Sequence, residues 1–351
     1  MTSKHAVLLA AFLLVVSTPG CYLAHVANGQ LRLLHAERPV EEVLSDPETP
    51  DEVRQSLATI QQARQYARTL GLEVGDQYTD YVDWPGDRVV TIVATSRPGE
   101  VTPAGFWFPF LGRLPYKGYF DPARAAAEAE TQRGRGLDAC IAPVPAYSTL
   151  GWLADPITSP MLIRGEGEAI ETIFHELVHA TVYLKDHADF NETAASFIGQ
   201  EASVRFYESR SDPDAAHERR REIEDQRALN QKLVHLRAEV AALYADAPSG
   251  AAREATRAAL ETATRAEIAA LPMRSGDAAA VAQALRLNDA CLALIATYGA
   301  DLHQFESALA AMDGDLVAFI ARLRAAEDAP DPADFLLAPA SAGESHEARS
   351  P

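Results

Sequence analysis

Hydrophobic positions recur with two different periods along the chain, and each period predicts a different type of element. Apolar residues three and four positions apart predict helices, whereas β-branched runs bounded by glycine and proline predict strands. Strands are expected at residues 88–95 and 137–144, and Pro109 confines the aromatic segment 106–110 to a sheet edge or a loop. The predicted helices cover residues 50–70, 121–133, 166–184, 190–207, 229–243, 252–271, 278–298, 302–312 and 316–326.

Two regions of the chain differ in this pattern. Residues 21–210 mix strands with helices, whereas residues 211–330 show helical spacing alone. The sequence therefore predicts an α+β fold with a small mixed sheet, followed by an all-helical C-terminal region packed against it. Residues 214–245 can form a coiled-coil arm or pack on the body; two heptads favour packing, and this helix is also a candidate contact for a partner. Residues 331–351 are expected to form a disordered tail.

Residues 1–20 have the features of a secretory signal of the lipoprotein type. A lysine precedes an apolar run at residues 6–16, which is shorter than the roughly 20 residues of a membrane-spanning helix. Gly20 before Cys21 resembles a bacterial lipobox, in which the cysteine is lipidated and becomes the mature N-terminus; Thr18 stands where leucine is usual. A plain cleaved signal and an uncleaved anchor are the alternatives.

The predicted lipid on Cys21 also predicts a location. It would hold the chain on a membrane of the cell envelope, facing the periplasm. Tyr22 is not the aspartate that commonly retains lipoproteins at the inner membrane, so the outer membrane is favoured where there are two. In an oxidising compartment Cys140 and Cys291 can pair, although their apolar neighbours favour buried free thiols.

The charge balance excludes some partners. The chain has 31 Lys and Arg against 50 Asp and Glu, a net charge of −19. Nucleic-acid binding requires a basic face, so no nucleic-acid partner is expected. The same excess of acid argues against electrostatic docking of the whole chain on anionic lipid.

The strongest chemical signal is an H-E-x-x-H motif within the predicted helix 166–184. His175 and His179 are four residues apart and therefore share one helical face, where both imidazoles can reach one metal ion. Glu176 lies beside His175 and can accept a proton from water. A buried helix with two structurally satisfied histidines is the alternative.

A catalytic zinc site needs a third protein ligand. The metzincin pattern fails, because Val182 and Lys185 stand where it requires glycine and histidine. Glu192 is the preferred ligand over His187, since it opens the next predicted helix, whose small residues allow close packing. Two histidines from one helix and a glutamate from the next define a gluzincin-like site within a zincin-like core. Ser196 occupies the position at which many gluzincins have an aspartate that orients a zinc-bound histidine.

The predicted chemistry is hydrolysis assisted by Zn²⁺. Water activated by the metal attacks a polarised carbonyl group, and Glu176 accepts the proton and passes it to the leaving amine. The tetrahedral oxyanion needs a further hydrogen-bond donor. The candidate donors are Tyr147, which is preferred, and Tyr183, Tyr207 and Tyr298.

Several further blocks make the chain resemble a family of bacterial lipoproteins described as predicted aminopeptidases and zinc peptidases. This resemblance covers most of the sequence, and implies zinc on His175, His179 and Glu192, with Glu176 catalytic and the block around Tyr147 lining the cleft. The matching blocks are GQLRLL at residues 29–34, GL at 71–72, YTDYVD at 78–83, YKGYF at 116–120, AYSTLGW at 146–152, FHELVH at 174–179, FNE at 190–192, RLNDA at 286–290 and Tyr298.

The leading hypothesis is a membrane-anchored zinc peptidase, an aminopeptidase by resemblance, that acts on peptides or proteins. The G-x-M-E-N segment that binds the free amine in well-known gluzincin aminopeptidases does not occur in the chain. Endopeptidase and carboxypeptidase action therefore stay open. The alternatives are a zinc amidase that acts on cell-wall peptides and a non-catalytic lipoprotein scaffold with a structural metal site.

Overall fold

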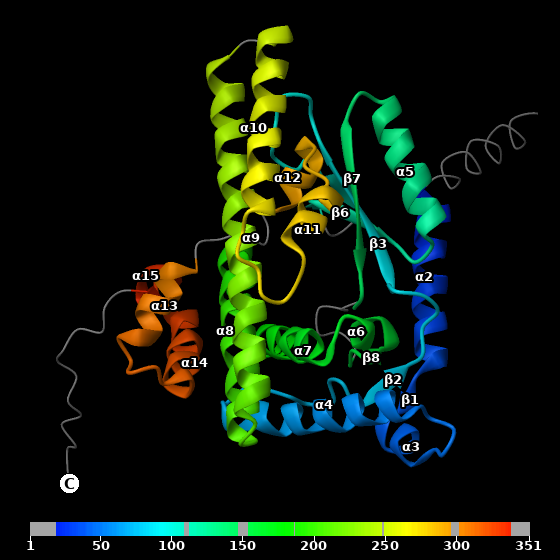
Figure 1. Ribbon diagram of the computed structural model, residues 1–351. Coiled ribbons are helices and arrows are strands. Elements are labelled where there is room, and N and C mark those ends of the chain that lie inside the picture. The colour runs from blue at the N-terminus through cyan, green and yellow to red at the C-terminus, as the bar shows by residue number, and fades with distance from the viewer. Residues whose placement is uncertain are drawn as a thin grey trace, which may run out of the picture. The chain divides into compact units, whose positions relative to one another are not determined.

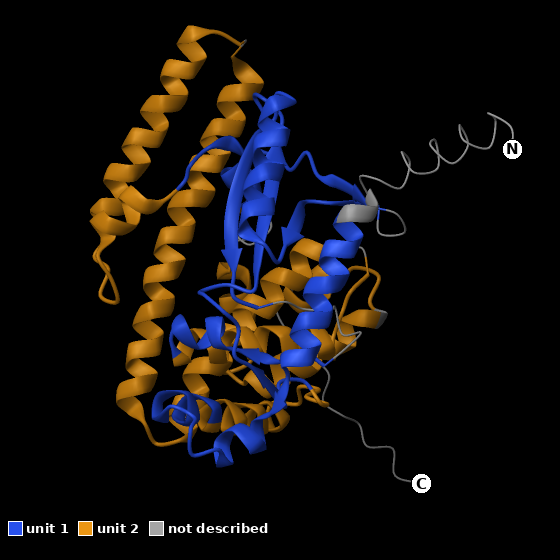
Figure 2. Cartoon of the chain, turned by 90° about the vertical axis from the view of Figure 1, so that its right-hand side faces the viewer, with its two compact units in different colours: residues 1–57, 77–165, 286–294 blue, residues 58–76, 166–285, 295–351 orange. Residues whose placement is uncertain are grey.

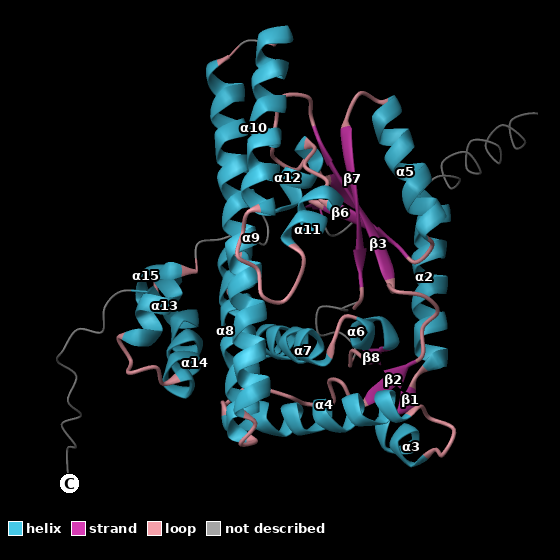
Figure 3. Ribbon diagram, in the orientation of Figure 1, coloured by secondary structure: helices cyan, strands magenta, loops and turns pink. Residues whose placement is uncertain are grey.

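The chain folds into two compact units whose segments alternate along the sequence (Figure 2). The fold is α+β, as predicted (Figure 3). Every described strand belongs to unit 1. Unit 1 comprises residues 1–57, 77–165 and 286–294, and unit 2 comprises residues 58–76, 166–285 and 295–351. The computed structural model describes residues 19–108, 112–146, 154–185, 187–247, 249–295 and 302–337.

Unit 1 is built around a three-stranded antiparallel sheet of order β6-β3-β7. The predicted strands 88–95 and 137–144 are confirmed as β3 and β7 (Figure 1). The strands of the unit are β1 (Arg38–Pro39), β2 (Asp80–Val82), β3 (Val90–Ser96), β4 (Phe106–Phe108), β5 (Gly112–Leu114), β6 (Tyr116–Tyr119), β7 (Asp138–Val144) and β8 (Ile157–Thr158). Its helices are α2 (Pro19–Ala36), α3 (Val40–Ser45), the start of α4 (Asp51–Thr69), α5 (Pro122–Gly134), α6 (Ser159–Ile163) and most of α12 (Asp289–Ile295).

The two faces of the central sheet bury different partners. Val93 packs against the alanines of α5 on one face, while Val90 and Ile92 pack against a cluster with α2 on the other. This alternation follows from the two-residue period of a strand. Gly29 of α2 lies against the Phe120 ring, and a Cβ atom there would stand 2.0 Å from the ring, so only glycine permits this approach.

Two smaller sheets complete unit 1. Strands β1, β2 and β8 form one, with β1 antiparallel and β8 parallel to β2. Strands β4 and β5 form a two-stranded antiparallel ribbon. The aromatic segment predicted to lie at an edge is thus confirmed over residues 106–108; Pro109 and Phe110 fall outside the described residues.

The single helix predicted at residues 278–298 is wrong. The chain instead forms α11 (Ala278–Ala284) and α12, bent by 119°. Leu285 is extended, and the carboxylate of Asp138 on β7 accepts hydrogen bonds from the backbone N–H of Ala290 and the side chain of Asn288. Residues distant in the sequence therefore supply the cap that starts α12.

Cys140 and Cys291 form a disulfide between β7 and α12, so the preferred interpretation of free thiols is wrong. Both side chains are buried, as their apolar neighbours suggested. The bond closes a sequence separation of 151 residues within unit 1.

Unit 2 consists of helices. Besides most of α4, it contains α7 (Glu166–Thr181), α8 (Ala188–Ser209), α9 (Pro213–Asp246), α10 (Ala251–Ala269), α11, α13 (His303–Ala310), α14 (Leu316–Ala325), the 3₁₀ turn Ala326–Asp328 and α15 (Pro332–Leu337). Helix α9 packs against α8 and α10 and buries Leu233, Leu236 and Val240, which confirms the predicted helical spacing. The units are thus interleaved, in contrast to the predicted linear division between residues 210 and 211.

The C-terminal part of the described chain is more ordered than predicted. Residues 332–337 form α15, in which Leu336 is fully buried, so the expected disordered tail does not begin at residue 331. Residues 338–351 lie outside the described residues.

Within the described part of the chain, no single helix has the length and apolar character needed to cross a membrane. Helices α11 and α12 meet these limits only when the bent pair is taken together.

Candidate metal centre

Helix α7 carries the H-E-x-x-H motif and is fixed by its apolar face. Ile170, Ile173, Phe174 and Leu177 are completely buried. Glutamates in the first turn favour the start of the helix through its dipole. His175 and His179 lie on the remaining face, one turn apart, and are partly buried.

Helix α8 approaches α7 closely because its facing residues are small. A Cβ atom at Gly199 would stand 3.0 Å from the carbonyl oxygen of Glu171 and 3.2 Å from the backbone nitrogen of His175. Ala194 and Ala195 are buried on the same helix. Glycine at position 199 therefore sets the distance between the two helices.

The connection between the helices is held by Asn191, a residue whose role the sequence pattern did not predict. Its side-chain amide donates to the carbonyl oxygen of Leu184 at 2.7 Å, and its side-chain oxygen accepts from the Leu184 backbone N–H at 3.0 Å. Asn191 is buried and precedes Glu192 directly. The clamp thus fixes the turn that brings Glu192 back toward α7.

The structure brings His175, His179 and Glu192 together, as predicted. Their donor atoms lie within 4.8 Å of one another, and no other such group of ligand side chains occurs among the described residues. The two Nε2 atoms are 3.1 Å apart. The carboxylate oxygens of Glu192 lie 3.5 Å from Nε2 of His175 and 3.4 Å from Nε2 of His179.

These distances fit a tetrahedral zinc site. Ligand atoms bound to zinc at about 2.0–2.1 Å in tetrahedral geometry stand about 3.3 Å from one another. Nδ1 of His179 is buried and has no hydrogen-bond partner in the described chain, whereas Nδ1 of His175 lies 3.4 Å from the Ser196 hydroxyl. Ser196 therefore occupies the place expected for a group that orients a histidine ligand.

The three side chains also perturb one another electrostatically. Burial raises the pKa of Glu192, but hydrogen bonds from His175 and His179 outweigh it and lower that pKa to about 2. Burial lowers the pKa of His179, but the hydrogen bond and charge of Glu192, with the charge of Glu176, leave the pKa raised overall. Glu192 is therefore an ionised carboxylate, which is the form that binds a metal.

The remaining predicted site residues lie in different places relative to the three candidate ligands. Glu176 is partly exposed beside His175, and its role as a base stays a prediction. His187 precedes α8 as an exposed residue and does not join the cluster. The preferred oxyanion donor Tyr147, together with Tyr298, lies outside the described residues.

The donor role of Tyr183 and Tyr207 stays a prediction that their positions do not favour. Helix α7 ends at Thr181, so Tyr183 does not share the face of His175, and its side chain is 62% exposed. Tyr207 donates a hydrogen bond to Glu166, the first residue of α7. Fifteen residues of α8 separate Tyr207 from Glu192, which corresponds to about 22 Å along the helix.

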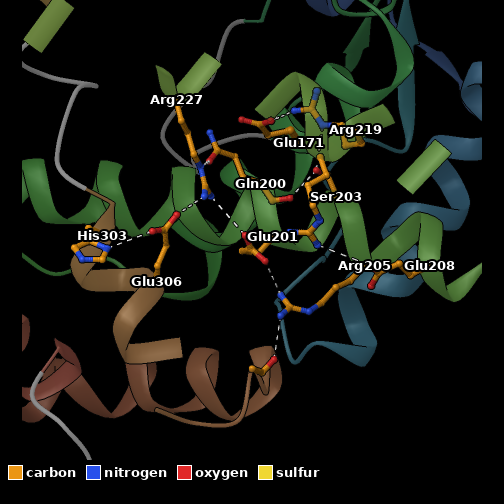
Figure 4. A network of polar contacts seen from close by, with 12 residues as sticks. Glu171, Gln200, Glu201, Ser203, Arg205, Glu208, Arg219, Arg227, His303 and Glu306 are labelled. Carbon is orange, nitrogen blue, oxygen red and sulfur yellow. Dashed lines mark hydrogen bonds and ion pairs between the residues drawn. The ribbon is translucent and has the colours of Figure 1, made fainter. Parts of the chain in front are cut away.

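A buried ion pair holds helix α7 in place one turn before His175. Arg219 of α9 pairs with Glu171 of α7 and donates a hydrogen bond to Ser203 at 3.2 Å (Figure 4). It also bonds Glu222 at 2.7 Å. Arg219 is 5% exposed. This contact ties α7 to α9 and α8 within unit 2.

The sequence profile of a family described as "putative aminopeptidase" matches residues 21–334. The chain therefore belongs to this family, and membership indicates a peptidase, a class of hydrolase. No curated protein and no solved structure matches the chain significantly.

Proposed function

We propose that the chain is a zinc-dependent peptidase, lipid-anchored at Cys21, that hydrolyses peptide bonds with Glu176 as general base. The observation that carries this proposal is the convergence of His175, His179 and Glu192 from α7 and α8. Family membership supports the peptidase activity. Two histidines from one helix and a carboxylate from the next form a gluzincin-like donor set, with one position left for water.

Each residue has a distinct role in the proposed reaction. Bound Zn²⁺ would supply Lewis-acid chemistry, because it activates water at neutral pH and polarises a carbonyl group. Glu176 accepts the proton of the attacking water and donates it to the departing amine nitrogen. Asn191 and Gly199 position Glu192 and His175, respectively, and the Ser196 hydroxyl orients His175.

The disulfide supports the proposed location. Disulfides persist in oxidising compartments such as the periplasm, and Cys140 is bonded to Cys291. Together with the signal at residues 1–20, this disulfide supports our proposal of a membrane of the cell envelope, facing the periplasm, with the outer membrane favoured where there are two.

The direct test of the enzymatic proposal is Glu176→Gln. Turnover of a peptide library should fall at least about a hundredfold, while bound zinc stays at the wild-type level, because glutamine cannot take the proton and is not a ligand. Asp189→Asn, at an exposed acidic position on α8, is the matched control and should keep activity. A wild-type protein that binds zinc but cleaves nothing in a broad library would favour the scaffold. Equal turnover of wild type and Glu176→Gln would refute the role of Glu176.

A further inference from the structure

Helix α2 carries an apolar stripe on the side that faces away from the core of unit 1. Leu23, Leu31 and Leu34 are 54%, 53% and 37% exposed, and Ala27 is exposed between them. Spacings of four and three residues place all of these on one helical face. The opposite face packs against the core at Gly29. A stripe of this kind is a candidate contact surface.

The stripe begins directly at the predicted lipid attachment site. Helix α2 starts at Pro19, so Cys21 lies within its first turn and no linker separates it from the folded unit. Tyr22 is fixed in place: its ring centroid lies 5.9 Å from that of Phe108 and 5.4 Å from that of Tyr119, and its hydroxyl donates to Gly118. A lipid on Cys21 would therefore lead straight into a packed helix.

An exposed tryptophan lies on strand β4, next in sequence to a residue that contacts Tyr22. Trp107 on β4 is 70% exposed, and its neighbour Phe108 contacts Tyr22. Tryptophan is the side chain most typical of the interface between membrane and water. Figure 2 faces this side of unit 1, and α2 runs across it.

The charge of this surface differs from that of the whole chain. Neither α2 nor residues 101–120 contain an aspartate or glutamate, although 50 of the 351 residues are acidic; composition would place about five acids in these segments. They carry Arg32 and Arg113 instead, together with Lys117, whose charge is paired with Glu128 of α5. These two segments therefore add no negative charge of their own that anionic headgroups would repel. Burial lowers the pKa of His25 of α2, although Asp121 lies close enough to oppose this shift.

We propose that the apolar face of α2, together with Trp107, lies on the phospholipid bilayer that holds the lipid of Cys21. This proposal rests on the lipidation proposed above. The leucines enter the boundary between headgroups and acyl chains, while Asn28 at the polar edge of the helix faces the headgroups. Arg32 lies over the ring of Trp84. Unit 1 is thereby held at the membrane surface rather than on a flexible tether.

The experiment uses the full-length lipidated protein in vesicles of phosphatidylethanolamine and phosphatidylglycerol. Leu31→Cys introduces one free thiol for a fluorescent label, because Cys21 is lipidated and the other two cysteines form a disulfide. Ile163→Cys on α6 is the matched control, an aliphatic residue of unit 1 that is 65% exposed. Each label is quenched in turn by nitroxide-labelled lipid and by aqueous iodide, and flotation of the vesicles reports anchoring.

We expect the label at position 31 to show at least about threefold more quenching by lipid nitroxide, and less by iodide, than the label at position 163. Equal quenching at both positions, in protein that floats with the vesicles, would refute the contact of α2 with the bilayer but not the lipid anchor. Protection from iodide without lipid quenching would overturn it in favour of a protein partner. Protein that does not float would refute the lipid anchor, and the surface with it.

Discussion

Unit 1, which contains the sheets, and the helical unit 2 use different interactions to hold distant segments of the chain in position. In unit 1 a disulfide and the carboxylate of Asp138 attach the distant segment 286–294 to strand β7. In unit 2 the three candidate metal ligands are positioned by close helix packing at Gly199, by the Asn191 clamp and by the buried Arg219. A covalent bond persists when neighbouring side chains change slightly. Positions set by helix packing, in contrast, shift when a substitution moves one helix by a few tenths of an ångström.

The largest effect is expected from the buried charge in unit 2. Arg219→Ala leaves Glu171 without its partner, and loss of one member of a buried pair costs about 3–5 kcal/mol. The free energy of unfolding, measured with urea and circular dichroism, should fall accordingly. Arg97→Ala, in an exposed pair with Glu100, should cost under about 1 kcal/mol. Similar losses in the two variants would contradict the structural role of Arg219.

Removal of the covalent bond in unit 1 comes next. A double variant, Cys140→Ser with Cys291→Ser, should lose about 2–4 kcal/mol of stability, because the bond closes a long loop in the unfolded chain. Dithiothreitol should lower the melting temperature of the wild type and leave that of the double variant unchanged. An identical response to the reductant in both proteins would show that the two cysteines do not pair.

A change in the spacing of α7 and α8 should have a smaller effect, which is confined to zinc affinity. Gly199→Ala places a methyl group against the backbone of Glu171 and His175, so we expect zinc affinity to fall about tenfold, in the range for groups that position ligands. Titration calorimetry measures this change. Gly134→Ala, where a Cβ atom meets no neighbour, should keep zinc affinity. Unchanged affinity in Gly199→Ala would contradict the packing account.

The smallest expected effect is on the pH dependence of stability, to which Glu128 of unit 1 contributes. Burial raises the pKa of Glu128, but hydrogen bonds from Tyr119, Gln132 and Lys117 outweigh it, so its pKa lies below the ordinary 4.5. A lowered carboxyl pKa contributes stability that is present above about pH 4.5 and is lost as the pH falls below that value. Melting temperature should therefore decline less between pH 5 and 3, roughly, in Glu128→Gln than in wild type. The exposed Glu130→Gln is the control, and parallel curves for all three proteins would refute this contribution.

The candidate metal-binding triad was predictable from the sequence because its three residues lie within one short segment. The four-residue spacing of His175 and His179 requires one helix, and Glu192 opens the next. The Asn191 clamp was missed, although an asparagine just before the ligand at a helix start is a signal of side-chain hydrogen bonds to backbone.

The wrong predictions depend on contacts between distant parts of the chain. The break between α11 and α12 is stabilised by Asp138, 152 residues before Ala290 in the sequence. The pairing of Cys140 with Cys291 likewise follows from the packing of α12 on the sheet. The hydrophobic periodicity of a sequence predicts one segment at a time, so it could not predict either of these long-range contacts.

The metal content of the purified protein tests the central claim most directly. We predict about one zinc ion per chain in the wild type, and its loss at submicromolar free zinc in His175→Ala and Glu192→Ala, while Glu176→Gln keeps it. A wild-type protein that binds no zinc after the metal is supplied, or a Glu192→Ala variant that binds it as tightly as the wild type, would contradict the account.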